Sequence, residues 1–455
     1  MDTYEVLVLG AGPGGYLCAE KSAAAGLSTV LFEEHAVGGT CLNEGCIPTK
    51  ALLNSAKIYR HARNGAPFGV SCSDLLLNPQ QAMTHKDKVV KTLVSGVEAG
   101  LKKNKVRLVR GHAEIIDKKG QVFEVSCEGI SYYGRRLVIA TGSETVVPPI
   151  DGLREGLSSG FVMTNREALT SSTVPQRLVV IGGGVIGLEM ASYYLDVGSE
   201  VTVVEMLPKI AGPTDTDLSR YLQKEYEKRG IHFLLSAKVI RIDTDGLVFE
   251  MNGEVKRVDC DRILLSAGRK ATVKGFGLEN LNPLMTKAGI AVNEQLETNV
   301  PGLYAVGDCN GRLMLAHTAY REAEVLVQHF LGNKDTVRYE SIPSVIYTDP
   351  EIASVGETEE SAKEKGLNIR AVKVPLAFSG RYVAENEELG GFVKLLLDRD
   401  KNRLIGVHLA GSYASEIIAA AAIMVDTQLP VNRLKQFVFP HPTVGEALHE
   451  AINQL

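Results

Sequence analysis

Two cysteines near the N-terminus are the residues of this sequence best suited to chemistry. Cys41 and Cys46 lie in the segment Gly38–Lys50, which reads GGTCLNEGCIPTK. Such a pair can bind zinc, form a structural disulfide or form a redox-active disulfide. A closed zinc site needs further ligands, and no second Cys or His pair in the sequence has comparable spacing. A structural disulfide is disfavoured in a reducing cytosol, so the pattern favours redox catalysis.

The spacing of the two cysteines also constrains the backbone between them. Residues five positions apart in a straight helix are separated by about 7.5 Å of axial rise, whereas a disulfide needs Cα atoms within roughly 7 Å. We therefore expect a distorted segment. Gly45 would permit it through its free backbone dihedrals, and Pro48 by ending or kinking the helical hydrogen-bond ladder.

A candidate base lies close to the C-terminus. His441 belongs to the segment FPHPTVGE, residues 439–446. A histidine between prolines is common in structural turns. Thiol–disulfide exchange, however, proceeds through a thiolate and needs a base that titrates near neutral pH. We predict that His441 is this base and that Glu446 orients it.

Two glycine-rich turns, each between a strand-like run and a helix, predict two dinucleotide sites. The first run, Tyr4–Leu9, ends at GAGPGG, and the second, Leu178–Ile181, ends at GGGVIG. The same number of residues separates the last glycine of each turn from an acidic residue, Glu33 or Glu205. The glycines allow a tight turn, close approach of a pyrophosphate and helix-on-strand packing.

Glu33 and Glu205 are expected to accept hydrogen bonds from ribose hydroxyls. The alternative is that both are exposed carboxylates at strand ends. A carboxylate at Glu205 would repel a 2′-phosphate, so the sequence favours NAD over NADP at the second turn.

Further apolar runs define the elements that must position these residues. Leu137–Gly142 and Ile263–Arg269 are predicted strands that end in glycine turns, and alternating strands follow from about Tyr339. The fold class is α/β, with two Rossmann-like dinucleotide-binding domains and a C-terminal mixed α/β domain. We place the first domain at residues 1–145 and 271–338, the second at 146–270 and the third at 339–455.

Length and charge narrow the classes of function. A chain of 455 residues exceeds the size of a single hydrophobic core. A net charge of −5 gives no excess of basic residues to bind nucleic acid or an anionic membrane. The first apolar run ends at Gly10 and is too short for a signal peptide or a membrane span. We expect a cytoplasmic protein without a metal site, nucleic-acid partner or membrane partner.

Together these residues resemble the pyridine nucleotide–disulfide oxidoreductase family over essentially the whole chain, from Gly10 to Glu446, most specifically in GGTCLNEGCIPTK. The resemblance implies that Cys41 exchanges with substrate and that Cys46 lies nearer a flavin. It also implies a homodimer, in which the C-terminal domain brings His441 and Glu446 to the disulfide of the other subunit.

The resemblance further implies two cofactors, FAD at the first glycine turn and NAD at the second. The residues implied for FAD are Gly10, Gly12, Gly15, Glu33, Lys50, Thr141, Gly142, Asp308 and Ala316. Those implied for NAD are Gly182, Gly184, Gly187, Glu189, Glu205 and Gly268. Lys50 and Glu189 match an ion pair beside the flavin, the alternative being a solvated lysine and an ordinary helix glutamate.

Within the family, GAGPGGY and Glu205 are similar to the lipoamide dehydrogenases, and no cysteine follows Cys309, unlike in mercuric reductases and large thioredoxin reductases. Phe439 departs from the usual His-x-His-Pro pattern. The implied reaction is oxidation of protein-bound dihydrolipoamide by NAD through FAD and the disulfide. The partner would be a lipoyl-bearing carrier protein of a 2-oxoacid dehydrogenase, glycine cleavage or acetoin system.

Two other functions remain open at this point. One is an NAD(P)H-dependent reductase of glutathione disulfide or coenzyme A disulfide. The other is a non-catalytic flavoprotein redox sensor, which would give His441 no role.

Overall fold

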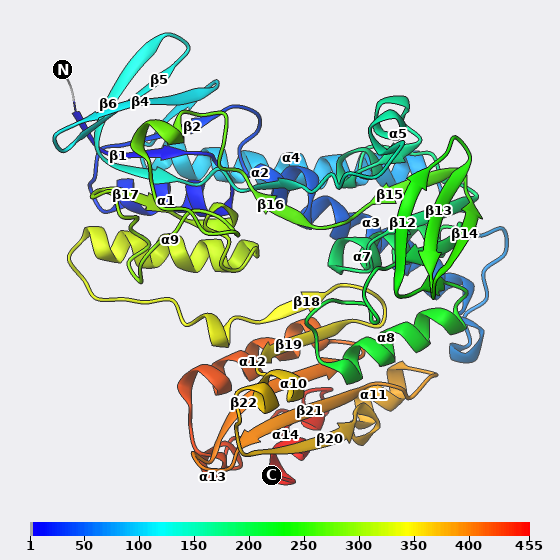
Figure 1. The fold of residues 1–455 in the computed structure, drawn as a ribbon. Coiled ribbons are helices and arrows are strands. Elements are labelled where there is room, and N and C mark those ends of the chain that lie inside the picture. Colours follow the sequence, from blue (N-terminus) through cyan, green and yellow to red (C-terminus); the bar gives the residue numbers. More distant parts are fainter. Residues whose placement is uncertain (1–2) are drawn as a thin grey trace. The chain divides into compact units, whose positions relative to one another are not determined.

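The chain folds into two compact units, in a computed structural model that describes residues 3–455 (Figure 1). Unit 1 comprises the described residues up to Ala51 together with Met83–Val146 and Gly268–Tyr339. Unit 2 comprises Leu52–Ala82, Val147–Ala267 and Glu340–Leu455. Each unit is therefore assembled from three separate stretches of sequence.

Unit 1 is built on a seven-stranded sheet in which β1 lies between two parallel neighbours, β2 and β6. The path runs β3-β2-β1-β6-β5-β4, and β17 also pairs with β6. Val6–Leu9 of β1 is buried and wholly apolar, as expected for a parallel strand covered on both faces. The strands are β1 (Thr3–Leu9), β2 (Thr29–Glu33), β3 (Arg107–Arg110), β4 (Ala113–Lys119), β5 (Val122–Cys127), β6 (Ile130–Ile139) and β17 (Leu303–Ala305).

Helices α1 and α9 pack against one another in unit 1, and β7 pairs antiparallel with β16. Helix α1 begins at Pro13, within the glycine-rich turn GAGPGG, because proline is well tolerated at the first helical position. The bounds are α1 (Pro13–Ala24), α2 (Gly39–Glu44), α9 (Ala316–Phe330), β7 (Ser143–Thr145) and β16 (Arg269–Ala271). Helix α3 (Cys46–Arg63) begins in unit 1 and ends in unit 2, and α4 (Pro79–Lys103) begins in unit 2 and ends in unit 1.

Unit 2 contains a second parallel sheet, with β9 between β10 and β15, in the order β11-β10-β9-β15-β8. A three-stranded antiparallel sheet, β12-β13-β14, accompanies it. The bounds are β8 (Val162–Met163), β9 (Arg177–Ile181), β10 (Glu200–Val204), β11 (His232–Leu234), β12 (Ala237–Ile242), β13 (Gly246–Met251), β14 (Glu254–Asp259), β15 (Arg262–Leu265), α5 (Leu153–Ser159), α6 (Asn165–Ala168), α7 (Val185–Asp196) and α8 (Thr216–Lys228).

The C-terminal part of unit 2 is a five-stranded antiparallel sheet in the order β18-β19-β22-β21-β20. Helices α12 and α14 pack on it around a core that includes Leu395, Val407 and Ala421. The bounds are β18 (Ser344–Ile346), β19 (Ile352–Gly356), β20 (Ile369–Pro375), β21 (Phe392–Asp398), β22 (Arg403–Ala410), α10 (Glu359–Glu364), α11 (Gly380–Glu385), α12 (Ala414–Thr427), α13 (Val431–Leu434) and α14 (Glu446–Asn453).

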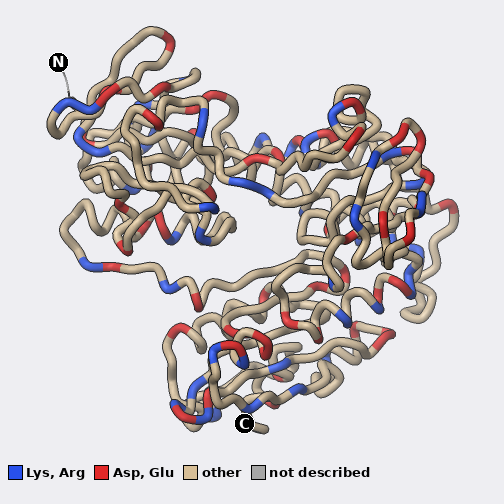
Figure 2. Tube along the Cα trace, in the orientation of Figure 1, with Lys and Arg blue, Asp and Glu red and all other residues tan. Residues whose placement is uncertain are grey.

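These sheets confirm the predicted fold class. Both strand–turn–helix repeats form parallel β-structure, and the C-terminal region is mixed α/β. The exact domain boundaries stay predictions. Acidic and basic residues are interspersed along both units (Figure 2). Among residues 3–455, no helix has both the length and the apolar character needed to cross a membrane.

Candidate active site

The two cysteines lie on either side of a helix break. Cys41 is in α2, and Cys46 is the first residue of α3. Gly45 joins the helices with φ −145° and ψ −106°, outside the helical region. The distortion predicted from the cysteine spacing is therefore confirmed, and Gly45 is the residue that provides it.

Close packing explains the glycine at this break. A Cβ atom on Gly45 would lie 3.0 Å from the carbonyl oxygen of Thr40. The Thr49 hydroxyl donates to the Gly45 carbonyl at 2.6 Å, which fixes the other side of the break. Pro48 does not end or kink the hydrogen-bond ladder as expected. It lies in the first turn of α3, where a helix needs no N–H donor.

The structure holds Cys41 and Cys46 as half-buried thiols that share a hydrogen bond. That hydrogen bond and burial raise the pKa of Cys41, and the charge of Lys50, one turn further along α3, opposes the rise. The Cys41 thiol thus holds its proton tightly. Reaction at Cys41 in its reduced form therefore calls for an external base.

Helix α2 packs directly against the first glycine turn. The Gly38 N–H donates to the Ala11 carbonyl at 2.8 Å. A Cβ atom on Gly39, which has φ +54°, would lie 2.6 Å from the Cα of Gly12. Two features that the sequence predicted separately, the cysteine pair and the first dinucleotide turn, are thus one site.

Two tyrosines beside the cysteines were missed in the sequence. The hydroxyls of Tyr16 in α1 and Tyr320 in α9 are hydrogen-bonded to one another. Burial, the largest cause, raises the pKa of both phenols, and the charge of Cys41 adds to the rise. Both therefore stay neutral beside the thiols. The position of Tyr16 directly after GAGPGG was the available signal; Tyr320 had none.

His441 and Glu446 form the pair expected from the sequence. Nδ1 of His441 lies 2.8 Å from Oε1 of Glu446, and the Thr443 N–H donates to Oε2 at 2.9 Å. Because a carboxylate only accepts, Nδ1 carries the proton in the neutral ring and Nε2 keeps a lone pair. The imidazole is 78% exposed, so its base nitrogen is open to a substrate or a second chain.

Phe439 stacks on His449, with ring centroids 4.7 Å apart and an interplanar angle of 12°. It also lines a pocket of about 290 Å³, together with Tyr413, Pro440 and Thr443. The departure from the family pattern at Phe439 thus builds an apolar wall two residues before His441.

The glycines of both turns divide into packed and open positions. Cβ atoms would lie 2.4 Å from Ala140 O at Gly10, 1.8 Å from Gly10 O at Gly15, 2.5 Å from Ser266 O at Gly182 and 2.1 Å from Gly182 O at Gly187. At Gly12 the nearest atom would be 4.0 Å away, and at Gly184 none lies within 4 Å. Gly12 and Gly184 are the N-cap residues of α1 and α7, and neither helix has a side-chain cap.

This arrangement fits a diphosphate at each turn. The open glycine leaves room for phosphate oxygens, and the uncapped first-turn N–H groups and the helix dipole favour an anion.

Glu33 and Glu205 occupy equivalent places in the two copies. Glu33 accepts the N–H groups of Ala11 at 2.7 Å and His35 at 2.8 Å. Glu205 accepts those of Gly183 at 2.6 Å and Leu207 at 2.7 Å. Neither is a carboxylate without partners at a strand end, because each accepts a hydrogen bond from a backbone N–H of its own glycine turn. Their ribose contacts stay predictions.

A buried carboxylate supports the turn that carries Asp308. Glu322 of α9 is fully buried and accepts the Gly307 N–H at 2.6 Å, the Asn310 amide at 3.0 Å and the Tyr339 hydroxyl at 2.7 Å. Burial raises the pKa of Glu322, and these hydrogen bonds oppose the rise. The sequence reasoning missed Glu322, because an acidic residue within a helix carries no signal of burial.

Unit 1 also contains Thr141, Gly142, Asp308 and Ala316, predicted for FAD, and Gly268, predicted for NAD. Asp308 accepts the hydroxyl of Ser143, and the Thr141 hydroxyl donates to Thr272 O at 2.7 Å. Gly142 and Gly268 have left-handed φ values of +71° and +109°, and Ala316 is the first residue of α9. Their contacts with a flavin or nucleotide stay predictions.

Lys50 and Glu189 belong to different units, so the ion pair expected between them stays a prediction. Glu189 in α7 is 4% exposed and accepts the Tyr347 N–H at 3.0 Å. Within residues 3–455, no group of three or more His, Cys, Asp or Glu side chains could hold a metal ion.

Comparisons with known proteins bear on this geometry. The family model described as pyridine nucleotide-disulphide oxidoreductase matches residues 4–323, and the dimerisation domain of the same family matches residues 342–452. Mitochondrial dihydrolipoyl dehydrogenase of Pisum sativum is 38% identical over 99% of this chain and 91% of its own length. Leghemoglobin reductase of Glycine max is 38% identical over 99% of this chain and 87% of its own length.

The crystal structure of LpdA from Mycobacterium tuberculosis has the same fold. It superposes with a TM-score of 0.90 over 99% of both chains, at 24% sequence identity.

Proposed function

The chain belongs to the pyridine nucleotide-disulphide oxidoreductase family, and from that premise we propose that it oxidises protein-bound dihydrolipoamide, with FAD and NAD as its cofactors. The observation that carries the proposal is the pairing of Cys41 with Cys46 across the break at Gly45, packed against the first glycine turn. The relative from Pisum sativum, which bears the name dihydrolipoyl dehydrogenase, supports the choice of substrate.

The chain's residues fit both cofactors. Gly10, Gly12 and Gly15 with Glu33 would hold FAD, and Gly182, Gly184 and Gly187 with Glu205 would hold NAD. When bound, FAD and NAD supply the two-electron acceptors that a reduced cysteine pair needs for turnover.

The chemical step at the cysteines follows from thiol–disulfide exchange. Nε2 of His441 accepts a proton from one substrate thiol, and the resulting thiolate attacks Sγ of Cys41 in the oxidised pair. The Cys41–Cys46 bond breaks and leaves Cys46 as a thiolate. The second substrate thiol, whose proton passes to the Cys46 thiolate, then attacks the substrate sulfur of the mixed disulfide and displaces Cys41, which takes up the proton held on Nε2 of His441. The substrate leaves as a disulfide, and the pair is left as two thiols, reduced by two electrons.

The base comes from a second copy of the chain in this proposal. The matched dimerisation domain, residues 342–452, contains both His441 and Glu446. An imidazole that is 78% exposed in one chain is suited to a contact completed by another. Glu446 keeps the ring oriented and stabilises the positive charge that it gains.

The carrier of the lipoyl group is part of the same proposal. A lipoyl-bearing protein of a 2-oxoacid dehydrogenase, glycine cleavage or acetoin system would deliver dihydrolipoamide, and we place the enzyme in the cytoplasm with it.

Steady-state kinetics of the FAD-loaded protein tests the proposal. We expect dihydrolipoamide to reduce NAD in preference to NADP, and NADH to reduce lipoamide faster than glutathione disulfide or coenzyme A disulfide. If either of those two disulfides were reduced faster, that disulfide would take the place of lipoamide as the proposed substrate. Absence of turnover with all three would favour the redox-sensor function.

A further inference from the structure

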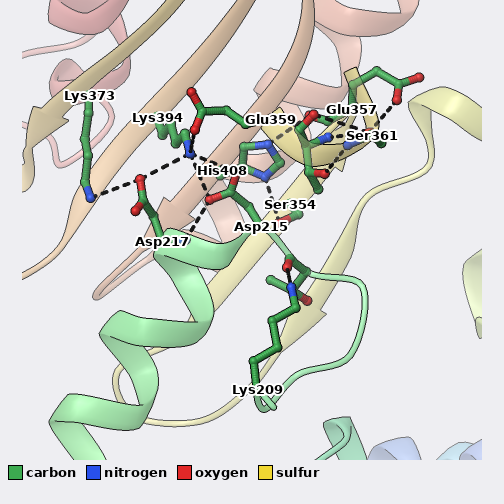
Figure 3. Close-up of polar contacts among 12 residues, drawn as sticks. Lys209, Asp215, Asp217, Ser354, Glu357, Glu359, Ser361, Lys373, Lys394 and His408 are labelled. Carbon is green, nitrogen blue, oxygen red and sulfur yellow. Dashed lines mark hydrogen bonds and ion pairs between the residues drawn. The ribbon is translucent and has the colours of Figure 1, made fainter. Parts of the chain in front are cut away.

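A lysine is buried in unit 2 among three carboxylates, at a distance in sequence from every predicted site residue (Figure 3). Lys394 of β21 is 3% exposed. Its Nζ donates to Asp215 at 2.9 and 3.0 Å, to Asp217 at 3.1 Å and to Glu359 at 3.1 Å. The three donors of the ammonium are thus matched by three carboxylates.

Asp215 is the partner that is fully buried, and it ends the segment Glu205–Asp215. Its Oδ1 caps α8 by accepting the Asp217 N–H at 3.0 Å. The Ser219 hydroxyl, one turn into α8, donates to the Ile210 carbonyl at 3.0 Å. The C-terminal end of the segment is therefore fixed to both α8 and β21.

The same segment also forms the wall of the second glycine turn. The Ala211 N–H donates to the Gly183 carbonyl at 2.8 Å, and the Gly183 N–H donates to Oε2 of Glu205 at 2.6 Å. The backbone N–H and carbonyl of Gly183 are thus both bonded to this segment. Ala211 has φ +62°, a left-handed conformation that an alanine adopts only when its surroundings impose it.

Burial of a charge costs free energy, and an apolar contact of the same size would hold two elements together at least as well. A charged contact differs in fixing one geometry, since the ammonium must meet all three carboxylates at once. The segment that it fixes carries Glu205, the residue predicted to select the nucleotide.

We propose that Lys394 is a positioning residue for the pyridine nucleotide at the second glycine turn. Through Asp215 it holds the segment Glu205–Asp215, and this segment sets the orientation of the Glu205 carboxylate and of Gly183. The inference rests on the proposed function in taking NAD as the ligand of that turn.

Asp215→Asn is the sharpest test. Asparagine still caps α8, and Lys394 keeps Asp217 and Glu359, so the fold is retained while the hold on the segment weakens. Lys394→Met removes the ion pair with Asp215 altogether. Lys373→Met is the matched control, because Lys373 contacts Asp217 at 3.3 Å from the neighbouring strand but is 47% exposed.

The measurements are the Kd of the FAD-loaded protein for NADH, the ratio of kcat/KM for NAD to that for NADP, and the rate at which dihydrolipoamide reduces the flavin without nucleotide. We expect Asp215→Asn and Lys394→Met to raise the Kd by about fivefold or more and to lower the ratio, while Lys373→Met changes each by less than about twofold. The flavin-reduction rate should stay at the parent value.

An unchanged Kd and ratio in Asp215→Asn would overturn the proposal, even if its melting temperature falls, because the lysine would then only support the fold. If Lys394→Met is insoluble, Asp215→Asn decides alone. A parent protein that binds no NADH or prefers NADP would instead overturn the proposed function.

Discussion

The imidazole of His441 is held by Glu446, with 2.8 Å between Nδ1 and Oε1. The second carboxylate oxygen accepts the Thr443 N–H at 2.9 Å, so the glutamate is itself fixed by the backbone. That backbone hydrogen bond, followed by the one from His441, lowers the pKa of Glu446. The carboxylate therefore stays ionised throughout the range in which a histidine titrates, and the ring keeps Nε2 as its base nitrogen.

Removing the base should slow the reaction with dihydrolipoamide. We expect His441→Gln to lower the rate of flavin reduction by dihydrolipoamide about 10²- to 10⁴-fold, as for loss of a general base. Glu446→Gln should have a smaller effect in the same direction, because the ring remains but loses its orienting charge. Stopped-flow flavin absorbance measures both.

His112→Gln is the control for these variants, since His112 and Glu34 form another exposed pair, with 3.1 Å between Nδ1 and Oε2. Its rate should equal that of the parent. A parent-like rate in His441→Gln would remove the base from the mechanism.

Replacing either cysteine should abolish turnover without loss of the flavin. Cys41→Ser and Cys46→Ser each leave one thiol, which cannot form an intramolecular disulfide. We expect no measurable lipoamide-dependent NAD reduction, whereas the flavin absorbance per chain stays at the parent value. Cys72→Ser, which changes an exposed cysteine, should keep full activity. Turnover in Cys41→Ser would exclude this pair as the redox centre.

The helix break should be sensitive to a single methyl group. Gly45→Ala would place a Cβ atom 3.0 Å from Thr40 O, forcing α2 and α3 apart at the cysteines. We expect slower turnover, a shifted redox potential of the pair and a stability loss of about 1–3 kcal/mol, as for overpacking.

Gly96→Ala provides the contrast, because Gly96 lies in α4 with no atom within 4 Å of its Cβ position. It should stabilise the protein by about 0.5–1 kcal/mol and leave turnover unchanged. If both variants turned over like the parent, packing at Gly45 would have no role in the chemistry.

Glu322 should matter for flavin retention. Glu322→Gln keeps only one acceptor oxygen. Its NH₂ either faces the Gly307 N–H and the Asn310 amide, which are donors themselves, or takes the place of the oxygen that accepts the Tyr339 hydroxyl. An unmatched buried donor costs about 1–3 kcal/mol, so we expect the turn carrying Asp308 to loosen and the Kd for FAD to rise about tenfold. Titration of the apoprotein by flavin fluorescence measures this.

Glu324→Gln, on the same helix but exposed, should bind FAD like the parent. Equal FAD affinity in Glu322→Gln and Glu324→Gln would show that the buried carboxylate does not support the flavin site.

His408 should contribute to acid destabilisation. It is fully buried, with Nε2 2.9 Å from Glu357 O and Nδ1 3.0 Å from Ser354 Oγ. Burial lowers its pKa, and Lys394 adds to this while Asp215 and Glu360 oppose it. The unfolded chain therefore binds more protons than the folded one below about pH 6.5, so stability falls as the pH falls, by up to about 1.4 kcal/mol per pH unit.

His408→Gln keeps a donor toward Glu357 O but does not titrate. We expect its melting temperature to depend less on pH between 5 and 6.5 than that of the parent. Parallel curves for the two proteins would assign the acid sensitivity to other groups.

The sequence by itself determined the features that depend on neighbouring residues. The two strand–turn–helix repeats followed from apolar runs, glycines and equal spacing to Glu33 and Glu205, because these patterns reflect local backbone preferences. The break between Cys41 and Cys46 followed from helix and disulfide geometry alone. The pairing of His441 with Glu446 was within reach for the same reason, since only four residues separate them.

Only the tertiary structure decided which distant groups meet. It packed Gly39 against Gly12, buried Glu322 behind Gly307, and brought Lys394 to Asp215 across 179 positions of sequence. Side-chain type and spacing carry no information on these contacts, because a lysine or glutamate is ordinarily solvated. Which strands become neighbours decides whether its charge is buried, and that order is fixed by the packing of whole sheets and helices.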